Sequence, residues 1–333
     1  MLFIRLLPLL LLPCSSLSPS SPQALASPQA LATFPIGDPA YHACLPHLRT
    51  ISTPVPRAVS PSLSTTSTYI HIPPASPASL PPLLLFPGFD SSCLEYRRLL
   101  PLLSQRGVRA YAADVHGWGF GDLSPTCSFA ASSRLAAAAS FAAALCESEA
   151  LPPASLAYAG ASLGGAVALS LASSLPTPGV ILLDAQGNVD GTGPTPPGPF
   201  LSLGVSLLRS WPLRAFANRL SYKDAPKFAT RDAIEIGCLH TRREGWREAT
   251  VEFIESGGFR PVKDARAVGE KGVPALLLWG EQDGVLPKEN VALFRERIPQ
   301  VQVSMVDECG HVPHLEQPEI ACDRIVKFLE TLS

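Results

Sequence analysis

Short apolar runs alternate with helix-like stretches from about residue 68 to the end of the chain, and this rhythm constrains the fold more than any other feature. The expected strands cover 69–72, 83–86, 108–113, 156–159, 180–183, 274–279 and 301–306. The expected helices cover 95–105, 134–148, 163–173 and 319–332. Strands that are apolar throughout are buried on both faces, and helices between them make them parallel. The sequence therefore predicts an α/β fold with a doubly wound, mostly parallel sheet and a site at the carboxyl ends of its strands.

Residues 186–268 interrupt this rhythm. They begin with a Gly- and Pro-rich run over 186–199 and continue with helical stretches around 200–220 and 232–256. This pattern predicts a helical cap (lid) inserted after the strand at 180–183. The two parts of the sheet domain would then be 66–185 and 269–333.

Charge is unevenly distributed along the chain. The net charge is -2, so no overall field would attract nucleic acid, and we expect no nucleic-acid partner. The stretch from 209 to 248, in contrast, holds nine Lys and Arg against five Asp and Glu. Such a stretch is most often a solvated helical face. It would also suit peripheral contact of the cap with an anionic membrane surface or partner.

Residues 1–65 look like a targeting sequence rather than a domain. The chain begins MLFIRLLPLLLLP, a basic start followed by a short apolar run, and small residues flank possible cleavage sites at 24–26 and 30–32. The segment is also poor in acidic residues and rich in Ser, as transit peptides are. It predicts delivery to a plastid (chloroplast) through a signal peptide and a transit peptide, with a plain secreted protein as the alternative. Because prolines interrupt its apolar run, we expect no transmembrane helix.

No cofactor or metal is expected. The eight cysteines include no CxxC pair and no Cys/His cluster at zinc spacing, so most of them are predicted to be free, buried thiols. The chain also lacks a phosphate-binding loop, and Gly117–Gly121 does not fit the spacing of a dinucleotide-binding motif.

A nucleophile is predicted at Ser162. It lies in Gly160-Ala161-Ser162-Leu163-Gly164, between an expected strand and an expected helix. The pattern G-x-S-x-G at such a junction forms a tight turn that exposes the serine, and the glycines Gly160 and Gly164 leave room for it. The alternative is a serine that merely caps the helix.

A serine hydroxyl needs a base, and the base needs an acid that orients it. Asp283 follows the expected strand 274–279, and His311 follows the expected strand 301–306. Both would lie at the same edge of the sheet as Ser162, in the chain order serine, acid, histidine. The sequence therefore predicts the triad Ser162, His311 and Asp283.

Other residues compete for two of these roles. His314 is a second possible base, and Asp184, after the strand 180–183, is the main alternative acid, with Glu281 behind it. His116 also follows a strand, but no partner is evident and a structural role is favoured.

Catalysis at a serine also needs two backbone N–H groups that stabilise the oxyanion. One would come from Leu163, directly after the nucleophile. The other would come from Phe89, in the turn Pro87-Gly88-Phe89-Asp90 after the strand 83–86. Gly88 would allow the close approach of this turn.

Five motifs of the chain resemble those of a known family. The motifs that carry the resemblance are Gly-x-Ser-x-Gly, Pro-Gly-Phe at 87–89, Asp-x-x-Gly-Trp-Gly at 114–119, Trp-Gly-Glu-x-Asp at 279–283 and Cys-Gly-His-x-Pro-His-x-Glu-x-Pro at 309–318. Over residues 66–333 they look like an α/β-hydrolase. In that family the triad falls on Ser162, Asp283 and His311.

Two longer stretches resemble a particular group within this family. PGFDSSCLEYRRLLPLL and DVHGWGFGDL resemble plastid α/β-hydrolases of plants and algae. Those relatives are linked to chlorophyll dephytylation and to the supply of prenyl alcohol for tocopherol synthesis. The resemblance implies a plastid enzyme that acts on a phytyl or prenyl ester.

The sequence thus predicts a serine hydrolase of a lipophilic carboxylic ester, and it does not determine the oligomeric state. The apolar stretch Phe200–Leu213 would either roof the pocket of such an ester or only cover the sheet. Two alternatives stay open: hydrolysis of a thioester or carbon–carbon bond by the same triad, and a non-catalytic ligand-binding protein with this fold. A reaction through an aspartate nucleophile is disfavoured because position 162 is serine.

Overall fold

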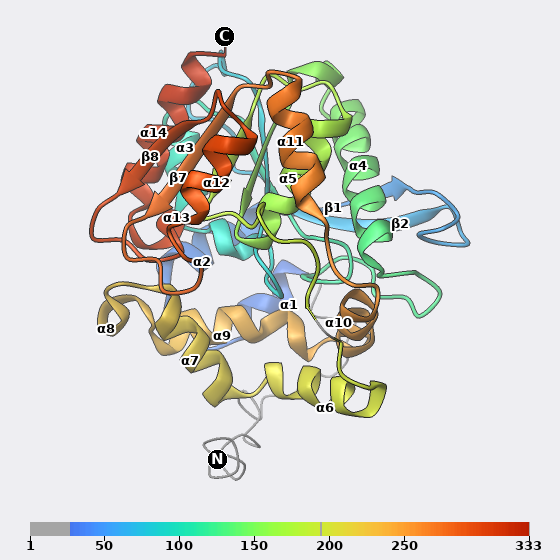
Figure 1. Ribbon diagram of the computed structural model, residues 1–333. Coiled ribbons are helices and arrows are strands. Elements are labelled where there is room, and N and C mark those ends of the chain that lie inside the picture. The colour runs from blue at the N-terminus through green and yellow to red at the C-terminus, as the bar shows by residue number, and fades with distance from the viewer. Residues whose placement is uncertain (1–26, 194, 333) are drawn as a thin grey trace.

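The computed structural model describes residues 27–193 and 195–332 (Figure 1). Their eight-stranded sheet has the order β1-β2-β4-β3-β5-β6-β7-β8. The strands are β1 (Leu48–Pro54), β2 (Ser64–Ile70), β3 (Leu83–Phe86), β4 (Ala110–Ala113), β5 (Ala157–Ala161), β6 (Val180–Leu183), β7 (Ala275–Gly280) and β8 (Gln302–Val306). Neighbouring strands from β4 to β8 are parallel, whereas β2 runs antiparallel to both β1 and β4. The predicted mostly parallel α/β sheet is confirmed.

Helices cover both faces of the sheet because its central strands are apolar throughout. In β3, Leu83 and Leu85 belong to one buried cluster, and Leu84 and Phe86 belong to the other. The first cluster includes residues of α3 (Leu99–Gln105) and α14 (Pro318–Glu330); the second includes residues of α4 (Ala131–Ser148), α5 (Leu163–Ser174), α11 (Pro261–Glu270) and α12 (Asn290–Arg297). Figure 1 shows α3 and α14 on one side of the sheet and α4, α5 and α11 on the other.

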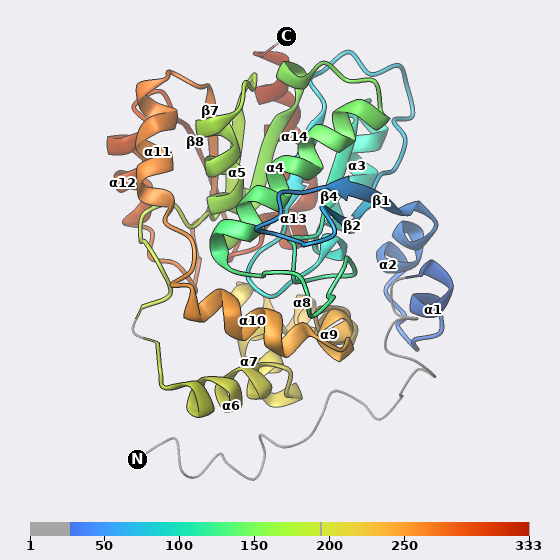
Figure 2. The ribbon, with the colours of Figure 1, turned by 90° about the vertical axis from the view of Figure 1, so that its right-hand side faces the viewer.

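Five helices connect β6 to α11 and lie together beyond one edge of the sheet (Figures 1 and 2). They are α6 (Gly198–Leu208), α7 (Trp211–Ser221), α8 (Ala225–Phe228), α9 (Arg231–Cys238) and α10 (Trp246–Glu255). We call these helices, together with the 3-10 turn η5 (Leu239–Arg242) that joins α9 to α10, the cap. The structure differs from the predicted range 186–268 at its end, because α11 packs against α5 in the sheet domain. Its Ala265 and Val268 are fully buried there, so the amphipathic helix belongs to the core.

The fold also begins earlier than the predicted boundary at residue 66. The structure places α1 (Pro28–Ala32), α2 (Pro39–Cys44) and the hairpin of β1 and β2 before or across that position. Leu31 and Tyr41 are fully buried. The hairpin is rich in Ser and Thr and lies at the edge of the sheet, so its composition resembles that of a linker although it is structured. The apolar start of the chain and the cleavage pattern at 24–26 lie outside the described residues.

The seven cysteines that the structure describes are all free and buried, as the sequence predicts, and Cys14 lies outside the described residues. Over 27–193 and 195–332, no helix has both the length and the apolar character needed to cross a bilayer.

Candidate active site

Ser162 lies on a sharp turn between β5 and α5. Its backbone has φ 49° and ψ −120°, a strained conformation for a residue with a side chain. A Cβ atom at Gly160 would lie 2.0 Å from the Gly164 carbonyl oxygen, and one at Gly164 would lie 2.1 Å from the Phe86 oxygen. Both positions therefore require glycine. Ser162 occupies the N-cap position of α5, but its hydroxyl makes no capping hydrogen bond, so the helix-cap interpretation does not explain it.

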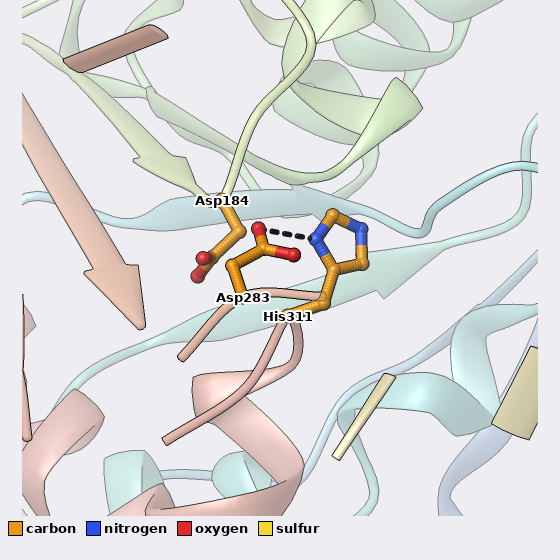
Figure 3. Close-up of side chains that lie close together, drawn as sticks. All are labelled: Asp184, Asp283 and His311. Atoms are coloured by element: carbon orange, nitrogen blue, oxygen red, sulfur yellow. Dashed lines mark hydrogen bonds and ion pairs between the residues drawn. The ribbon is translucent and has the colours of Figure 1, made fainter. Parts of the chain in front are cut away.

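Asp283 and His311 meet at the same edge of the sheet (Figure 3). His311 Nδ1 lies 2.8 Å from Asp283 Oδ2, while Asp283 Oδ1 accepts hydrogen bonds from the N–H groups of Val285 and Leu286. Burial alone would raise the pKa of Asp283, but the hydrogen bond and charge of His311 and these two N–H groups hold it below the usual value. The carboxylate therefore stays charged and orients the ring, which leaves Nε2 available as a base.

The structure separates the competing residues from this pair. His314 is fully buried and its Nε2 lies 3.0 Å from Glu95 Oε1. Glu281 is exposed. The His116 ring packs 4.8 Å from the ring of Phe129, and burial lowers the pKa of His116 to about 4. These positions favour His311 as the base.

Asp184, the other candidate acid, lies directly behind Asp283 (Figure 3). It is fully buried, has φ 42°, and its Oδ1 accepts a hydrogen bond of 2.9 Å from the N–H of Gly280. Burial, and then the neighbouring Asp283 carboxylate, raise the pKa of Asp184 well above its usual value. This environment therefore favours the protonated, neutral form of Asp184. Oxygen and nitrogen atoms of Asp184, Asp283 and His311 that could bind a cation lie within 4.8 Å of one another. The hydrogen bond between His311 and Asp283, with a protonated Asp184 beside it, already explains this cluster.

The protonated state of Asp184 leads to a prediction about stability. The pKa of Asp184 in the folded protein lies above the ordinary value of 3.8, so between these two pKa values the unfolded chain binds fewer protons than the folded protein. The free energy of unfolding therefore falls as the pH rises from 3.8 to the pKa of the folded state. Asp184→Asn keeps an acceptor for Gly280 and has no proton to lose. We expect this variant to raise Tm at pH 8, by about 2–4 °C for each kcal/mol gained, and the difference to shrink toward pH 4. Calorimetry that shows a lower Tm at pH 8, or a gain independent of pH, would refute a neutral Asp184.

The two predicted oxyanion donors lie on either side of the serine. Leu163 is the first residue of α5, and its N–H has no acceptor within the helix. Phe89 follows β3 in the turn that contains Gly88, where an added Cβ would lie 3.4 Å from the Ser162 Cβ. Gly88 N–H donates to Glu95 Oε2 at 3.0 Å, which fixes the turn. We call Pro87–Asp90 the oxyanion loop.

A cavity of about 350 Å³ lies between this edge of the sheet and the cap. Ser162 and His311 both line it, with Phe89 from the oxyanion loop and Leu220 and Ile234 from the cap. Its size is that of a pocket for a small organic molecule or for part of a larger one. The arrangement places a serine hydroxyl, an oriented imidazole and apolar side chains of the cap around one cavity.

Sequence reasoning missed two buried carboxylates beside the oxyanion loop. Glu95 bonds both Gly88 and His314, and Asp90 bonds three residues of the cap. Both belong to the stretch that directly follows the Pro-Gly-Phe motif. The signal that could have identified them is the presence of charged residues close to a turn that contains glycine.

Comparisons with known proteins agree with this fold. A family model described as "Alpha/beta hydrolase family" matches residues 83–324. The Alpha/beta hydrolase domain-containing protein VTE7 of Arabidopsis thaliana is 33% identical over 254 residues, which cover 74% of this chain and 72% of that protein. Lipase 1 of Psychrobacter immobilis is 26% identical over 180 residues, 52% of this chain and 55% of the lipase. A thermophilic esterase from Thermogutta terrifontis has a similar solved structure, with TM-score 0.64, 20% identity, and coverage of 85% of this chain and 99% of that chain.

Proposed function

Because this chain belongs to the alpha/beta hydrolase family, we propose that it is a serine hydrolase that cleaves lipophilic carboxylic esters with Ser162, His311 and Asp283. Relatives and structural neighbours that are lipases and esterases support ester hydrolysis in general. The observation that best supports the triad is the 2.8 Å distance between His311 Nδ1 and Asp283 Oδ2, because His311 lines the same cavity as Ser162.

The geometry supports two half-reactions. Ser162 Oγ attacks the ester carbonyl while His311 Nε2 takes its proton, and the N–H groups of Leu163 and Phe89 stabilise the oxyanion. His311 then gives the proton to the leaving alcohol, which leaves an acyl group on Ser162. Water, activated by the same imidazole, attacks the acyl-enzyme and releases the acid and the free serine. Asp283 holds the tautomer of the ring and stabilises the imidazolium.

The substrate that we propose is the ester of a long isoprenoid alcohol, such as a phytyl ester. The apolar side chains of the cap that face the cavity, and the sequence motifs shared with plastid hydrolases, support this choice. The test is a panel of 4-nitrophenyl esters from acetate to palmitate, together with phytyl esters, an acyl-CoA and a diketone. Preference for long esters supports the proposal. Preference for the acyl-CoA or the diketone would favour thioester or carbon–carbon hydrolysis, and tight binding without turnover would favour a ligand-binding protein.

The place of action that we propose is the plastid, on the basis of the basic and apolar start of the chain and its low content of acidic residues. Expression of the full chain with a fluorescent protein at its C-terminus tests this proposal. Coincidence with chlorophyll fluorescence supports it, and appearance of the fusion in the medium would favour the secreted alternative.

The outer face of the cap supports a further part of the proposal, peripheral contact with an anionic membrane. Phe200 and Leu203 of α6 and Phe216 of α7 are 70%, 60% and 65% exposed, and Arg209 and Arg219 are exposed beside them. Apolar side chains next to cations are typical of a surface that binds at the lipid interface.

Replacing both Phe200 and Leu203 by serine is expected to weaken vesicle binding about 10²- to 10⁴-fold, since each buried apolar side chain is worth about 1.5–3 kcal/mol. Co-sedimentation with vesicles that contain phosphatidylglycerol measures this change. Ile320→Ser is the matched control, because Ile320 is 40% exposed but lies on α14, which is not part of the cap. Equal loss in both variants, or no binding by the unsubstituted protein, would contradict the membrane contact.

A further inference from the structure

Asp90, the residue directly after the oxyanion donor Phe89, is a buried carboxylate with an unusual number of partners. It is 3% exposed. Its Oδ1 lies 2.9 Å from His240 Nε2 and accepts a second hydrogen bond of 2.7 Å from Trp246 Nε1. Its Oδ2 forms an ion pair with Arg214. Three of the about four lone pairs of the carboxylate are therefore directed to side chains.

All three partners come from the cap, and each comes from a different element. Arg214 lies on α7, His240 on the 3-10 turn η5 (Leu239–Arg242) and Trp246 at the start of α10. Arg214 also donates to the backbone oxygen of Asp90 at 3.2 Å. One residue of the oxyanion loop is thus the common attachment point of three cap segments.

Helix α7 depends strongly on this attachment. None of its residues is buried, and only Trp211 and Ala215 pack against a small cluster on α9. In contrast, α10 is fixed to the sheet domain by other contacts, since Glu252 accepts hydrogen bonds from the N–H groups of Phe129 and Ala130 at the start of α4. The ion pair of Arg214 with Asp90 is therefore a side-chain contact that holds α7 over the serine, in addition to the 2.8 Å hydrogen bond that the His311 N–H donates to the Ser221 oxygen at the end of α7.

The backbone at Asp90 needs support of this kind. Its φ of 52° lies in the left-handed region, which is unfavourable for a residue other than glycine. Burial would raise the pKa of Asp90, but the charge of Arg214 and the bonds from His240 and Trp246 lower it. The carboxylate thus stays charged, and its bonds hold the chain in the turn that directs the preceding Phe89 N–H.

We infer that Asp90 is a positioning residue that couples the seating of the cap to the geometry of the oxyanion hole. Its three bonds to Arg214, His240 and Trp246 set the direction of the Phe89 N–H only while the cap is in place. This inference rests on the proposed function. It means that the cap contributes to the chemical step as well as to the pocket wall.

The test compares Arg214→Gln and Asp90→Asn with the unsubstituted full chain, with 4-nitrophenyl butyrate as substrate. Complete loss of an oxyanion donor lowers kcat about 10²- to 10³-fold, so a misdirected donor is expected to lower it about 10- to 100-fold with KM changed less than about threefold. A trifluoromethyl ketone, whose adduct carries an oxyanion, is expected to bind more weakly by the same factor. An ether analogue of the substrate, which forms no oxyanion, is expected to bind unchanged, and Arg214→Lys is expected to restore part of kcat.

A second ion pair of the cap provides the matched control. Glu235 and Arg242 lie 2.6 Å apart and are similarly buried, so Glu235→Gln removes a comparable contact and is expected to leave kcat unchanged. An unaltered kcat in Arg214→Gln, or equal weakening of the ketone and the ether, overturns the inference while the proposed function stands. If the unsubstituted protein shows neither ester hydrolysis nor an activated serine, the proposed function and the inference fail together. Asp90→Asn and Arg214→Gln are independent variants, so a folding defect in one leaves the other as the test.

Discussion

Ser162→Ala is expected to lower kcat for ester hydrolysis by about 10⁵-fold or more while the protein remains folded. The serine oxygen is the atom that forms the covalent bond, and no neighbouring side chain can replace it. Loss of the nucleophile from a serine triad has an effect of about this size, and the residual rate comes from binding and from the oxyanion donors alone.

The fold should not suffer from this change. Ser162 has a strained φ of 49°, and its hydroxyl makes no capping hydrogen bond, so alanine removes no structural contact of the side chain. Tm is expected to stay within about 2 °C, which corresponds to less than about 1 kcal/mol. His311→Ala should lower kcat to a similar extent. If Ser162→Ala retained more than a hundredth of the activity, another nucleophile would have to carry the reaction.

Asp283→Asn is expected to lower kcat about 10⁴-fold, whereas Asp184→Asn is expected to stay within about threefold of the unsubstituted protein. An amide at position 283 cannot stabilise the imidazolium, and it presents an N–H₂ group where His311 needs an acceptor, so the ring takes the wrong tautomer. An amide at position 184 reproduces the neutral acid that the buried environment already enforces. The two aspartates lie side by side, so each serves as the control for the other.

The pH dependence of these variants adds a second readout. Because His311 and its neighbours hold the pKa of Asp283 below the usual value, protonation of Asp283 should affect kcat/KM only in strongly acidic solution. A loss of kcat/KM that begins in only mildly acidic solution would therefore have another origin than protonation of Asp283. A large loss in Asp184→Asn with a small loss in Asp283→Asn would assign the acid to Asp184 and refute the pairing in the structure.

The main features of the sheet, and the positions of Ser162, Asp283 and His311 after its strands, are readable from the sequence for a physical reason. Runs such as Leu83–Phe86 and Val180–Leu183 are apolar on both faces, and only a covered parallel sheet buries both. Ser162, Asp283 and His311 each follow such a run, so topology alone brings them to one edge. The glycines around Ser162 then identify which serine has the exposed turn.

Other parts of the structure cannot be read in this way. The strands Leu48–Pro54 and Ser64–Ile70 lie at the edge of the sheet and are rich in Ser and Thr, so their composition resembles that of an unstructured leader. Helix Pro261–Glu270 shares its amphipathic pattern with the cap helices, and only its packing on Leu163–Ser174 assigns it to the core. The contacts of Asp90 join residues that are more than 120 positions apart, and no local pattern encodes them.

The most direct test of the triad is intact-mass labelling of the full chain with a fluorophosphonate, beside Ser162→Ala and His311→Ala. The full chain is required because α1, α2 and β1 precede residue 66 and belong to the fold. An activated serine predicts rapid addition of one label to the unsubstituted protein, its location on Ser162 by peptide mapping, and no label on either variant. A folded protein that takes up no label, or a label that persists in Ser162→Ala, would contradict a nucleophile at Ser162.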